Sequence, residues 1–307
     1  MIVASIDIGT NTVLLLIAEV NLNTGKIIPI QNEYRMPRIG KGIKATGNIG
    51  EERLKLLFSV LEEFSGFIKS HNCEHIIITG TNAFRIANNT SAIIGEIKKK
   101  FDYDLNVISG EEEAEFAFLG AISGFDVVEN SMVIDIGGSS TEIISGKSQK
   151  IITKKSLQLG SVSMTEQFLK HSPPLKSELN DLKKEVQEKL STIELKDTPA
   201  QVIAIAGTAT TLACMVSGFK VFDETLVNNY ILKKDVLKNL VDELSGLKQE
   251  VILKKFGPVM NGREDIILAG AYILLQIMEI FRIQNVSVSS TGIRYGAIVK
   301  YLEQAQT

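Results

Sequence analysis

Ile6-Asp7-Ile8-Gly9 at residues 6–9 reappears as Ile134-Asp135-Ile136-Gly137 at residues 134–137. Each copy ends an apolar run that is typical of a buried strand, and each leads through small polar residues into a second apolar run. The pattern of strand, short turn and strand therefore occurs twice. It indicates a duplicated α/β architecture with a cleft between the two halves.

Hydrophobic periodicity outlines the elements around each copy. Short apolar runs predict strands, and apolar residues at every third or fourth position predict helices. In the first half we expect strands at 2–8, 13–20, 26–31, 76–79 and 105–108, and helices at 50–70 and 110–122. In the second half we expect strands at 132–136, 141–145, 150–155, 201–206 and 285–289, and helices at 161–170, 176–190, from 208, 233–244, 263–281 and 292–302.

Composition restricts the classes of protein to which the chain can belong. Its 307 residues are 44% hydrophobic, which is enough for two domains with their own cores. The net charge of −3 gives no general basic field, so we expect no nucleic-acid partner. Cys73 and Cys214 lie far apart in the sequence and show no metal-ligand spacing. A disulfide framework is therefore not expected, which fits a reducing compartment. With neither a signal-peptide pattern nor a long uncharged span, we expect a cytoplasmic protein without a membrane partner.

The turn after the first apolar run has the composition of a phosphate-binding loop. Gly9 allows a phosphate to approach the backbone closely, and the side chains of Thr10, Asn11 and Thr12 add hydrogen-bond donors. The Asp7 carboxylate precedes this turn and is suited to a divalent cation. An ordinary hairpin turn contains the same kinds of residue, so that alternative stays open.

The second copy of the turn is richer in glycine and hydroxyl groups. Asp135 stands before it and Glu142 after it, so two carboxylates can converge on the same place. Phosphoryl transfer depends on such positioning and charge neutralisation more than on covalent help. The turn consists of small residues throughout: Gly137, Gly138, Ser139 and Ser140.

Two further segments begin expected helices. Gly207 and Thr208 follow an apolar run, where the N–H groups of a helix N-terminus bind anions; simple capping by Thr208 is the alternative. Three consecutive glutamates, 111–113, open the helix at 110–122. They form a solvated first turn that the helix dipole favours, unless one of them faces inward as a general base. The sequence does not say which glutamate that is.

Basic residues near these loops are candidates for phosphate contacts. Arg85 follows an expected strand, and Arg35, Arg38 and Lys41 lie close together in the sequence. Arg263 and Arg294 follow or border loops. The planar fork of arginine fits phosphate geometry. A single arginine is nevertheless more often a surface residue than a ligand contact.

Taken together, these segments resemble the exopolyphosphatase and guanosine pentaphosphate phosphohydrolase (Ppx/GppA) family, in its short two-domain form, within the actin, sugar-kinase and Hsp70 superfamily. The second loop departs from the family pattern, because Ser139 stands where a third glycine is usual. The resemblance covers nearly the whole chain and rests on IDIGTNT at 6–12, TNAFRIANN at 81–89, ISGEEEAEFAFLGA at 108–121, IDIGGSSTE at 134–142, LGSVSMTEQF at 159–168, IAGTATTLA at 205–213 and GREDIILAGAYIL at 262–274.

The resemblance implies a fold and a division of the chain. The fold is α/β, with two actin-like, ribonuclease-H-like domains flanking a central cleft. The first domain would comprise residues 1–123 and 296–307, and the second would comprise residues 124–295. A homodimer is implied by analogy with this architecture alone.

The resemblance also implies roles for particular residues. Glu113 matches the catalytic base, and Arg85 matches a residue that contacts the phosphate chain. Asp135 and Glu142 match acidic metal-binding positions, where Glu142 also orients the attacking water, and Asp7 is a further candidate ligand. The cofactor would be Mg²⁺ or another divalent cation. The phosphate-binding residues would come from three loops: Gly9, Thr10, Asn11, Thr12, Gly137, Gly138, Ser139, Ser140, Gly207 and Thr208.

The activity that the resemblance implies is exopolyphosphatase activity, in which the terminal phosphoanhydride bond of inorganic polyphosphate is hydrolysed and orthophosphate is released. Hydrolysis of the 5′-terminal phosphate of guanosine pentaphosphate is the first alternative. An ATP-dependent kinase and a nucleotide sensor or scaffold of the same superfamily are two others. The glutamate cluster beside the phosphate loops argues for a hydrolase, because a sensor has no need of a strong base.

Overall fold

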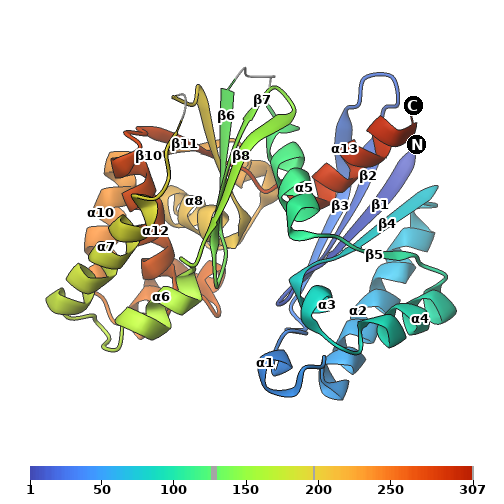
Figure 1. Cartoon of the computed structure of the whole chain (residues 1–307), viewed down its shortest axis with the longest axis horizontal. Coiled ribbons are helices and arrows are strands. Elements are labelled where there is room, and N and C mark those ends of the chain that lie inside the picture. The colour runs from blue at the N-terminus through green and yellow to red at the C-terminus, as the bar shows by residue number, and fades with distance from the viewer. Residues whose placement is uncertain (126–129, 196–197, 306–307) are drawn as a thin grey trace. The chain divides into compact units, whose positions relative to one another are not determined.

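A computed structural model describes residues 1–125, 130–195 and 198–305 of the chain. The chain separates into two compact units, which Figure 1 shows coloured along the sequence. Unit 1 comprises Met1–Ser123 and Gly292–Thr307, and unit 2 comprises Gly124–Thr291. The C-terminal segment thus returns to unit 1 at Gly292, whereas the sequence analysis placed the return at residue 296.

Unit 1 is built on a five-stranded sheet in the order β3-β2-β1-β4-β5. The central strand β1 (Ile2–Ile8) pairs antiparallel with β2 (Val13–Val20) and parallel with β4 (His75–Gly80). Strand β3 (Ile27–Arg35) lies antiparallel to β2, and β5 (Leu105–Val107) lies parallel to β4. A short turn joins β1 to β2, while helical segments make the crossovers that parallel strands require.

Helices cover both faces of this sheet. On one face α2 (Glu51–Ser70) and α4 (Thr90–Phe101) bury their apolar sides against alternate residues of β1 and β2. On the other face α13 (Ile293–Ala305), red in Figure 1, packs against the intervening residues, and α5 (Gly110–Ile122) lies beside it. Successive strand side chains point to opposite faces, so Asp7 belongs to the face that α13 covers. Two short helices complete the unit: α1 (Ile43–Thr46) and α3 (Asn82–Ile86).

Unit 2 repeats the topology of unit 1 and adds one strand. Its sheet has the order β10-β11-β9-β6-β7-β8, so the run from β8 to β11 matches the run from β3 to β5 strand for strand. The first three matching strands are antiparallel and the others parallel in both units. The duplicated α/β fold that the repeated sequence predicted is therefore confirmed. The strands are β6 (Asn130–Ile136), β7 (Thr141–Lys147), β8 (Lys150–Leu157), β9 (Gln201–Ile205), β10 (Tyr230–Lys233) and β11 (Asn285–Val288).

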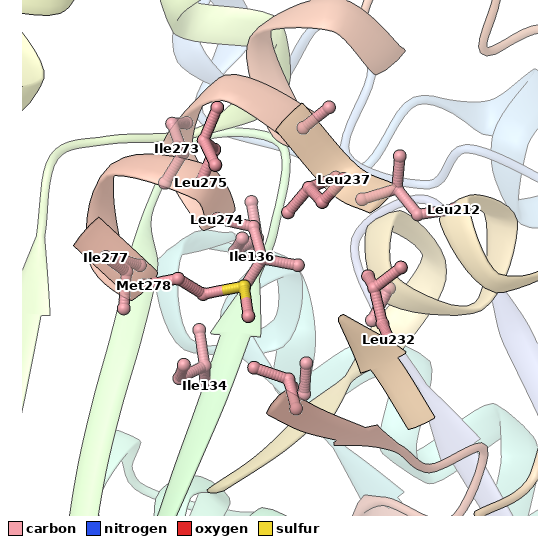
Figure 2. Close-up of a cluster of buried hydrophobic side chains, with 14 of the residues drawn as sticks. Ile134, Ile136, Leu212, Leu232, Leu237, Ile273, Leu274, Leu275, Ile277 and Met278 are labelled. Carbon is pink, nitrogen blue, oxygen red and sulfur yellow. The ribbon is translucent and has the colours of Figure 1, made fainter. Parts of the chain in front are cut away.

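The main core of unit 2 lies between this sheet and its helices. Figure 2 shows Ile134 and Ile136 of β6 together with Leu274 and Met278 of α12, all of them buried. The even-numbered positions of β6 thus face the core, which leaves Asp135 on the other face. The helices of the unit are α6 (Ser161–Phe168), α7 (Lys176–Leu190), α8 (Ala206–Ser217), α9 (Glu224–Val227), α10 (Lys234–Ser245), α11 (Gln249–Phe256) and α12 (Ile267–Ile280), with a 3-10 turn at Gly257–Met260.

The structure corrects several expected boundaries. Strand β3 runs to Arg35 rather than residue 31, and α12 begins at Ile267 rather than residue 263. Strand β10 and helix α11 were not predicted. Strand β10 has only four residues, and it is defined by its pairing with β11, which is distant in the sequence. A local sequence pattern therefore does not predict it.

In the part of the chain that the structure describes, no helix combines the length and the apolar character that crossing a bilayer requires.

Candidate active site

The two phosphate-loop candidates form the same turn. In unit 1 the Gly9 N–H donates to the carbonyl oxygen of Thr12 at 2.8 Å, and in unit 2 the Gly137 N–H donates to that of Ser140 at 2.9 Å. A Cβ atom would lie 3.2 Å from the accepting oxygen at Gly9 and 3.3 Å from it at Gly137, which is closer than ordinary contact. Glycine therefore suits the first position of both turns, and the repeated sequence gives a repeated structure.

The carbonyl groups of loop 1, residues 9–12, are held by a neighbouring segment. The Gly40 N–H donates to the Thr10 carbonyl at 2.8 Å, and the Arg38 N–H donates to the Asn11 carbonyl at 3.0 Å. Among the described residues, the N–H groups of Thr10, Asn11 and Thr12 have no hydrogen-bond acceptor. A turn with satisfied acceptors and several unused donors is suited to binding an anion.

The carbonyl groups of loop 2, residues 137–140, likewise accept hydrogen bonds from a neighbouring segment, the N-terminus of α6. The N–H groups of Ser161 and Val162 donate to the carbonyls of Gly137 and Gly138, both at 2.9 Å. The approach is so close that a Cβ on Gly160 would lie 2.2 Å from the Gly138 oxygen. Over residues 1–125, 130–195 and 198–305, the structure gives no acceptor for the N–H groups of residues 138–140. Loop 2 therefore also presents donors and no free backbone acceptors at its tip.

Two carboxylates stand opposite each other at the base of loop 2. Asp135 of β6 and Glu142 of β7 are direct partners in the antiparallel register, so their side chains lie next to each other on one face of the sheet. Both residues are half-buried. The Ser156 hydroxyl of β8 donates to Glu142 Oε1 at 2.7 Å, which fixes that carboxylate.

The third predicted loop contributes in a different way from the one expected. Helix α8 begins at Ala206, so Thr208 lies within its first turn and does not cap it. The Thr208 side chain is buried, and its hydroxyl donates to the Ile136 carbonyl at 3.0 Å, which ties α8 to β6. What remains for an anion is the set of N–H groups in the first turn of α8. The Arg263 guanidinium lies over this turn, because a Cβ on Gly207 would be 2.3 Å from Arg263 Nη2.

The structure gives the three glutamates of unit 1 different surroundings. Ser109 and Glu112 form a capping box: the Glu112 N–H donates to Ser109 Oγ at 3.1 Å, and the Ser109 N–H donates to Glu112 Oε2 at 2.8 Å. The hydrogen bond from the Ser109 backbone lowers the pKa of Glu112. Glu111 is exposed. Glu113, by contrast, turns toward α3, where its Oε2 lies 2.7 Å from Arg85 Nη1.

Arg85 is anchored at two points. Its Nη1 also donates to the Ile108 carbonyl, at 2.9 Å, just before α5 begins. The exposed fraction of the side chain is 27% for Arg85 and 31% for Glu113, so both groups remain accessible to a ligand. The predicted base and the predicted phosphate contact are therefore in direct contact with each other.

Asp7 is the most perturbed acid of unit 1. Its residue is 8% exposed, and Oδ1 has no hydrogen-bond partner in the described structure. Burial raises the pKa of Asp7 to about 7, with a further contribution from the negative charge of Glu113, while the Arg294 charge acts in the opposite direction. Perturbation of this kind, in a cluster with a second acid, is typical of functional sites.

A close helix contact fixes the position of α5, and with it Glu113. A Cβ on Gly120 would lie 2.0 Å from the Gly292 carbonyl oxygen, and one on Gly296 would lie 1.8 Å from that of Phe116. Helices α5 and α13 can therefore approach this closely only with glycine at both positions. The sequence analysis gave no role to this contact, although Gly120 stands in the motif at 108–121.

Sequence reasoning also gave no definite role to Arg294. This residue of α13 is 8% exposed and donates from Nη1 to the Leu15 carbonyl at 3.0 Å and to Asn32 Oδ1 at 2.6 Å. It thus joins the C-terminal helix to β2 and β3. Arginine in an apolar helix pattern is the signal that could have identified it, because a buried charge requires partners.

The acids present fit a divalent cation that is bound mainly by its substrate. Among the described residues, no three His, Cys, Asp or Glu side chains gather into a complete metal site. Mg²⁺ commonly takes one or two carboxylates together with water and substrate phosphates. The unpartnered Asp7 oxygen in unit 1 and the Asp135–Glu142 pair in unit 2 are ligand sets of this kind.

Known proteins that resemble this chain belong to the family that the sequence motifs indicated. Residues 16–305 match the Ppx/GppA phosphatase family. The chain is 32% identical to the bifunctional 3-dehydroquinate synthase/phosphatase of Fusobacterium nucleatum over 98% of its own length, and it spans 46% of that relative. It is 29% identical to exopolyphosphatase 2 of Mycobacterium tuberculosis, with 90% of this chain and 89% of the relative covered. The crystal structure of the Aquifex aeolicus Ppx/GppA family member superimposes with a TM-score of 0.91 and 31% identity, covering 100% of this chain and 99% of that one.

Proposed function

The chain belongs to the Ppx/GppA phosphatase family, and on that basis we propose that it is an exopolyphosphatase. It would hydrolyse the terminal phosphoanhydride bond of inorganic polyphosphate, releasing orthophosphate and a chain shorter by one phosphate. The observation that carries the proposal is the pair of identical turns, in which neighbouring segments occupy the carbonyls and leave the N–H groups unused. Such turns match the repeated negative charge of a phosphate chain better than they match a neutral substrate.

Glu113 is the general base of the proposed reaction. It accepts a proton from a water molecule, and the water oxygen forms a bond to the terminal phosphorus while the bond to the bridging oxygen breaks. Glu113 suits this role because it is accessible and because Glu112, its neighbour, is committed to capping α5. Arg85 holds the Glu113 carboxylate in place, and its partly exposed guanidinium is accessible to a phosphate oxygen of the substrate.

The loop N–H groups stabilise the charge on the phosphoryl oxygens as it redistributes. Preorganised donors of this kind act without rearranging during the reaction, which is why they contribute strongly to catalysis. In unit 2, Asp135 and Glu142 are the residues that would hold Mg²⁺ or a similar ion, and in unit 1 Asp7 is a candidate ligand for such an ion. When bound, such an ion neutralises phosphate charge and acts as a Lewis acid.

Guanosine pentaphosphate is the second candidate substrate, since its 5′ end presents the same anhydride chemistry to the same loops. A kinase or a nucleotide sensor would use the loops but would have no need of Glu113. Orthophosphate release from long-chain polyphosphate and from guanosine pentaphosphate, measured in parallel with Mg²⁺, distinguishes these functions. Release from polyphosphate that is lost with a chelator and in Glu113→Gln supports the proposal. Preference for the nucleotide would replace it, and release from neither substrate would exclude both.

A further inference from the structure

We propose that Arg38 and Lys41 form a second binding subsite for the phosphate chain, next to loop 1. The subsite would receive a phosphate further along the chain than the one bound by the N–H groups of loop 1. This inference rests on the proposed function, because it assigns a chain-binding role to residues beside the same loop. In the described structure, neither side chain makes an ion pair or a hydrogen bond with Glu113 or Arg85.

The segment that carries both residues is attached directly to loop 1. After β3 ends at Arg35, the chain continues alongside the loop through the Arg38–Asn11 and Gly40–Thr10 backbone hydrogen bonds. A Cβ on Gly40 would lie 2.1 Å from Thr10 Cγ2, so the two segments are in van der Waals contact. Any ligand that binds at loop 1 therefore lies close to this segment.

The backbone of the segment is held in a conformation that presents Arg38 outward. Arg38 has φ 51°, in the left-handed region that side chains other than glycine rarely adopt. Pro37 and Ile39, on either side, are buried, and they anchor the segment to unit 1. The arginine side chain is exposed between them. A conformation that costs energy in an ordinary surface turn is consistent with a functional role here.

The cations around loop 1 divide into two groups. Arg35 is paired with Glu33 and Glu63, and Arg53 donates to the Pro37 carbonyl and lies near Glu52. Arg38 and Lys41 are exposed, and the described part of the chain offers their side-chain nitrogens neither a carboxylate nor another hydrogen-bond acceptor. Two uncompensated positive charges thus stand beside a loop that itself has unused donors.

A phosphate chain is the ligand class that this arrangement fits. Loop 1 has three unused N–H groups, which suit a single phosphate. The next phosphates of a polyphosphate each carry charge at a short, regular spacing, and flexible exposed cations can follow such a chain without a shaped pocket. The subsite should therefore govern the affinity for long chains more than the rate of the chemical step.

The test is equilibrium binding of long-chain polyphosphate to the Glu113→Gln protein, with and without Arg38→Gln and Lys41→Gln together. Glutamine keeps a side chain at the position of positive φ, so the backbone cost is unchanged. The matched control is Lys26→Gln, which removes an exposed charge at the other end of β2, roughly 25 Å away at 3.3 Å per residue. Calorimetric titrations at two salt concentrations give the affinity and its salt dependence.

We expect the double variant to bind long-chain polyphosphate about tenfold more weakly and with a smaller salt dependence, because two cation–phosphate contacts are lost. In proteins with Glu113 intact, KM for long chains should rise by about the same factor, while kcat should change little. Lys26→Gln should match the parent protein in both measurements.

The binding measurement tests this inference separately from the proposed function. A protein that binds polyphosphate through Arg38 and Lys41 but releases no orthophosphate would refute the hydrolase and leave the subsite standing. An active protein whose affinity is the same in the double variant, or falls equally in Lys26→Gln, would refute the subsite alone. Failure of the parent protein to bind polyphosphate would overturn both.

Discussion

Nη1 of Arg85 lies 2.7 Å from Oε2 of Glu113, and the same nitrogen donates to the Ile108 carbonyl at 2.9 Å. One side chain of α3 therefore holds both the carboxylate and the backbone at the start of α5. Because both side chains are partly exposed, this ion pair contributes little to the free energy of unfolding. Its consequence is geometric, since it fixes one of three consecutive glutamates in a defined direction.

Glu113→Gln should lower kcat for orthophosphate release at least about 100-fold, because an amide cannot accept the proton from water. Glu112→Gln is the matched control, since it makes the same chemical change one residue earlier. Glutamine also serves at this position of a capping box, so activity and thermal stability should be retained. Steady-state kinetics and melting temperatures of both variants check the prediction. If Glu112→Gln caused the larger loss of activity, the assignment of the base would be wrong.

The stability of the metal-free protein should fall as pH rises from about 4 to about 7, through the contribution of Asp7. Its folded-state pKa is raised from 3.8 to about 7, so in this window the folded protein binds the proton more strongly than the unfolded chain does. At the upper end of this window, the free energy of unfolding is up to about 4 kcal/mol lower than under acid conditions. Asp7→Asn should remove this slope and raise the melting temperature at pH 8 in the presence of a chelator.

The effect of Mg²⁺ on the melting temperature tests whether Asp7 is a metal ligand. If Asp7 is a ligand, cation binding favours its ionised form, so added Mg²⁺ should raise the melting temperature more at pH 8 than at pH 5. The effect should be smaller in Asp7→Asn. An equal Mg²⁺ effect in both proteins at both pH values would remove Asp7 from the ligand set.

Gly120→Ala should destabilise the protein by about 1–3 kcal/mol or more, because the added Cβ meets backbone atoms of Gly292, just before α13, and of Gly296 within it, and no flexible side chain can move aside. Activity should also fall, since α5 carries Glu113. Gly95→Ala is the matched control, because Gly95 is an exposed helical glycine of α4 with open space around the added Cβ. That change should stabilise the protein by about 0.5–1 kcal/mol. Thermal unfolding distinguishes the two, and similar effects would mean that the α5–α13 contact is not tight.

Thr208→Val should lower stability by about 1 kcal/mol while leaving KM nearly unchanged, because the hydroxyl donates to the buried Ile136 carbonyl and is not available to a substrate. Thr210→Val serves as the comparison, since the Thr210 hydroxyl bonds to carbonyls within its own helix at Ala206 and Gly207. Melting temperatures and KM for polyphosphate test this. A large rise in KM with unchanged stability would show that Thr208 binds the substrate directly.

The sequence by itself determined the types of the main elements and the position of both loops. The repeated Ile-Asp-Ile-Gly segments mark equivalent strand ends because strand periodicity and glycine-containing turns are local properties, readable over a few residues. Helix α5 was predicted with the bounds that the structure gives, since its acidic first turn and apolar continuation are likewise local.

Tertiary structure decided the rest of the site. Three adjacent glutamates are equivalent by sequence. They differ in the structure because Glu112 forms a capping box with Ser109, while Glu113 forms an ion pair with Arg85 of another helix. Thr208 reads as a helix cap until β6 supplies an acceptor for its hydroxyl, and the pKa of Asp7 rises only when the helices beside it exclude water. Each of these outcomes depends on partners distant in the sequence, whose approach is fixed by close packing such as the contact of Gly120 with Gly292.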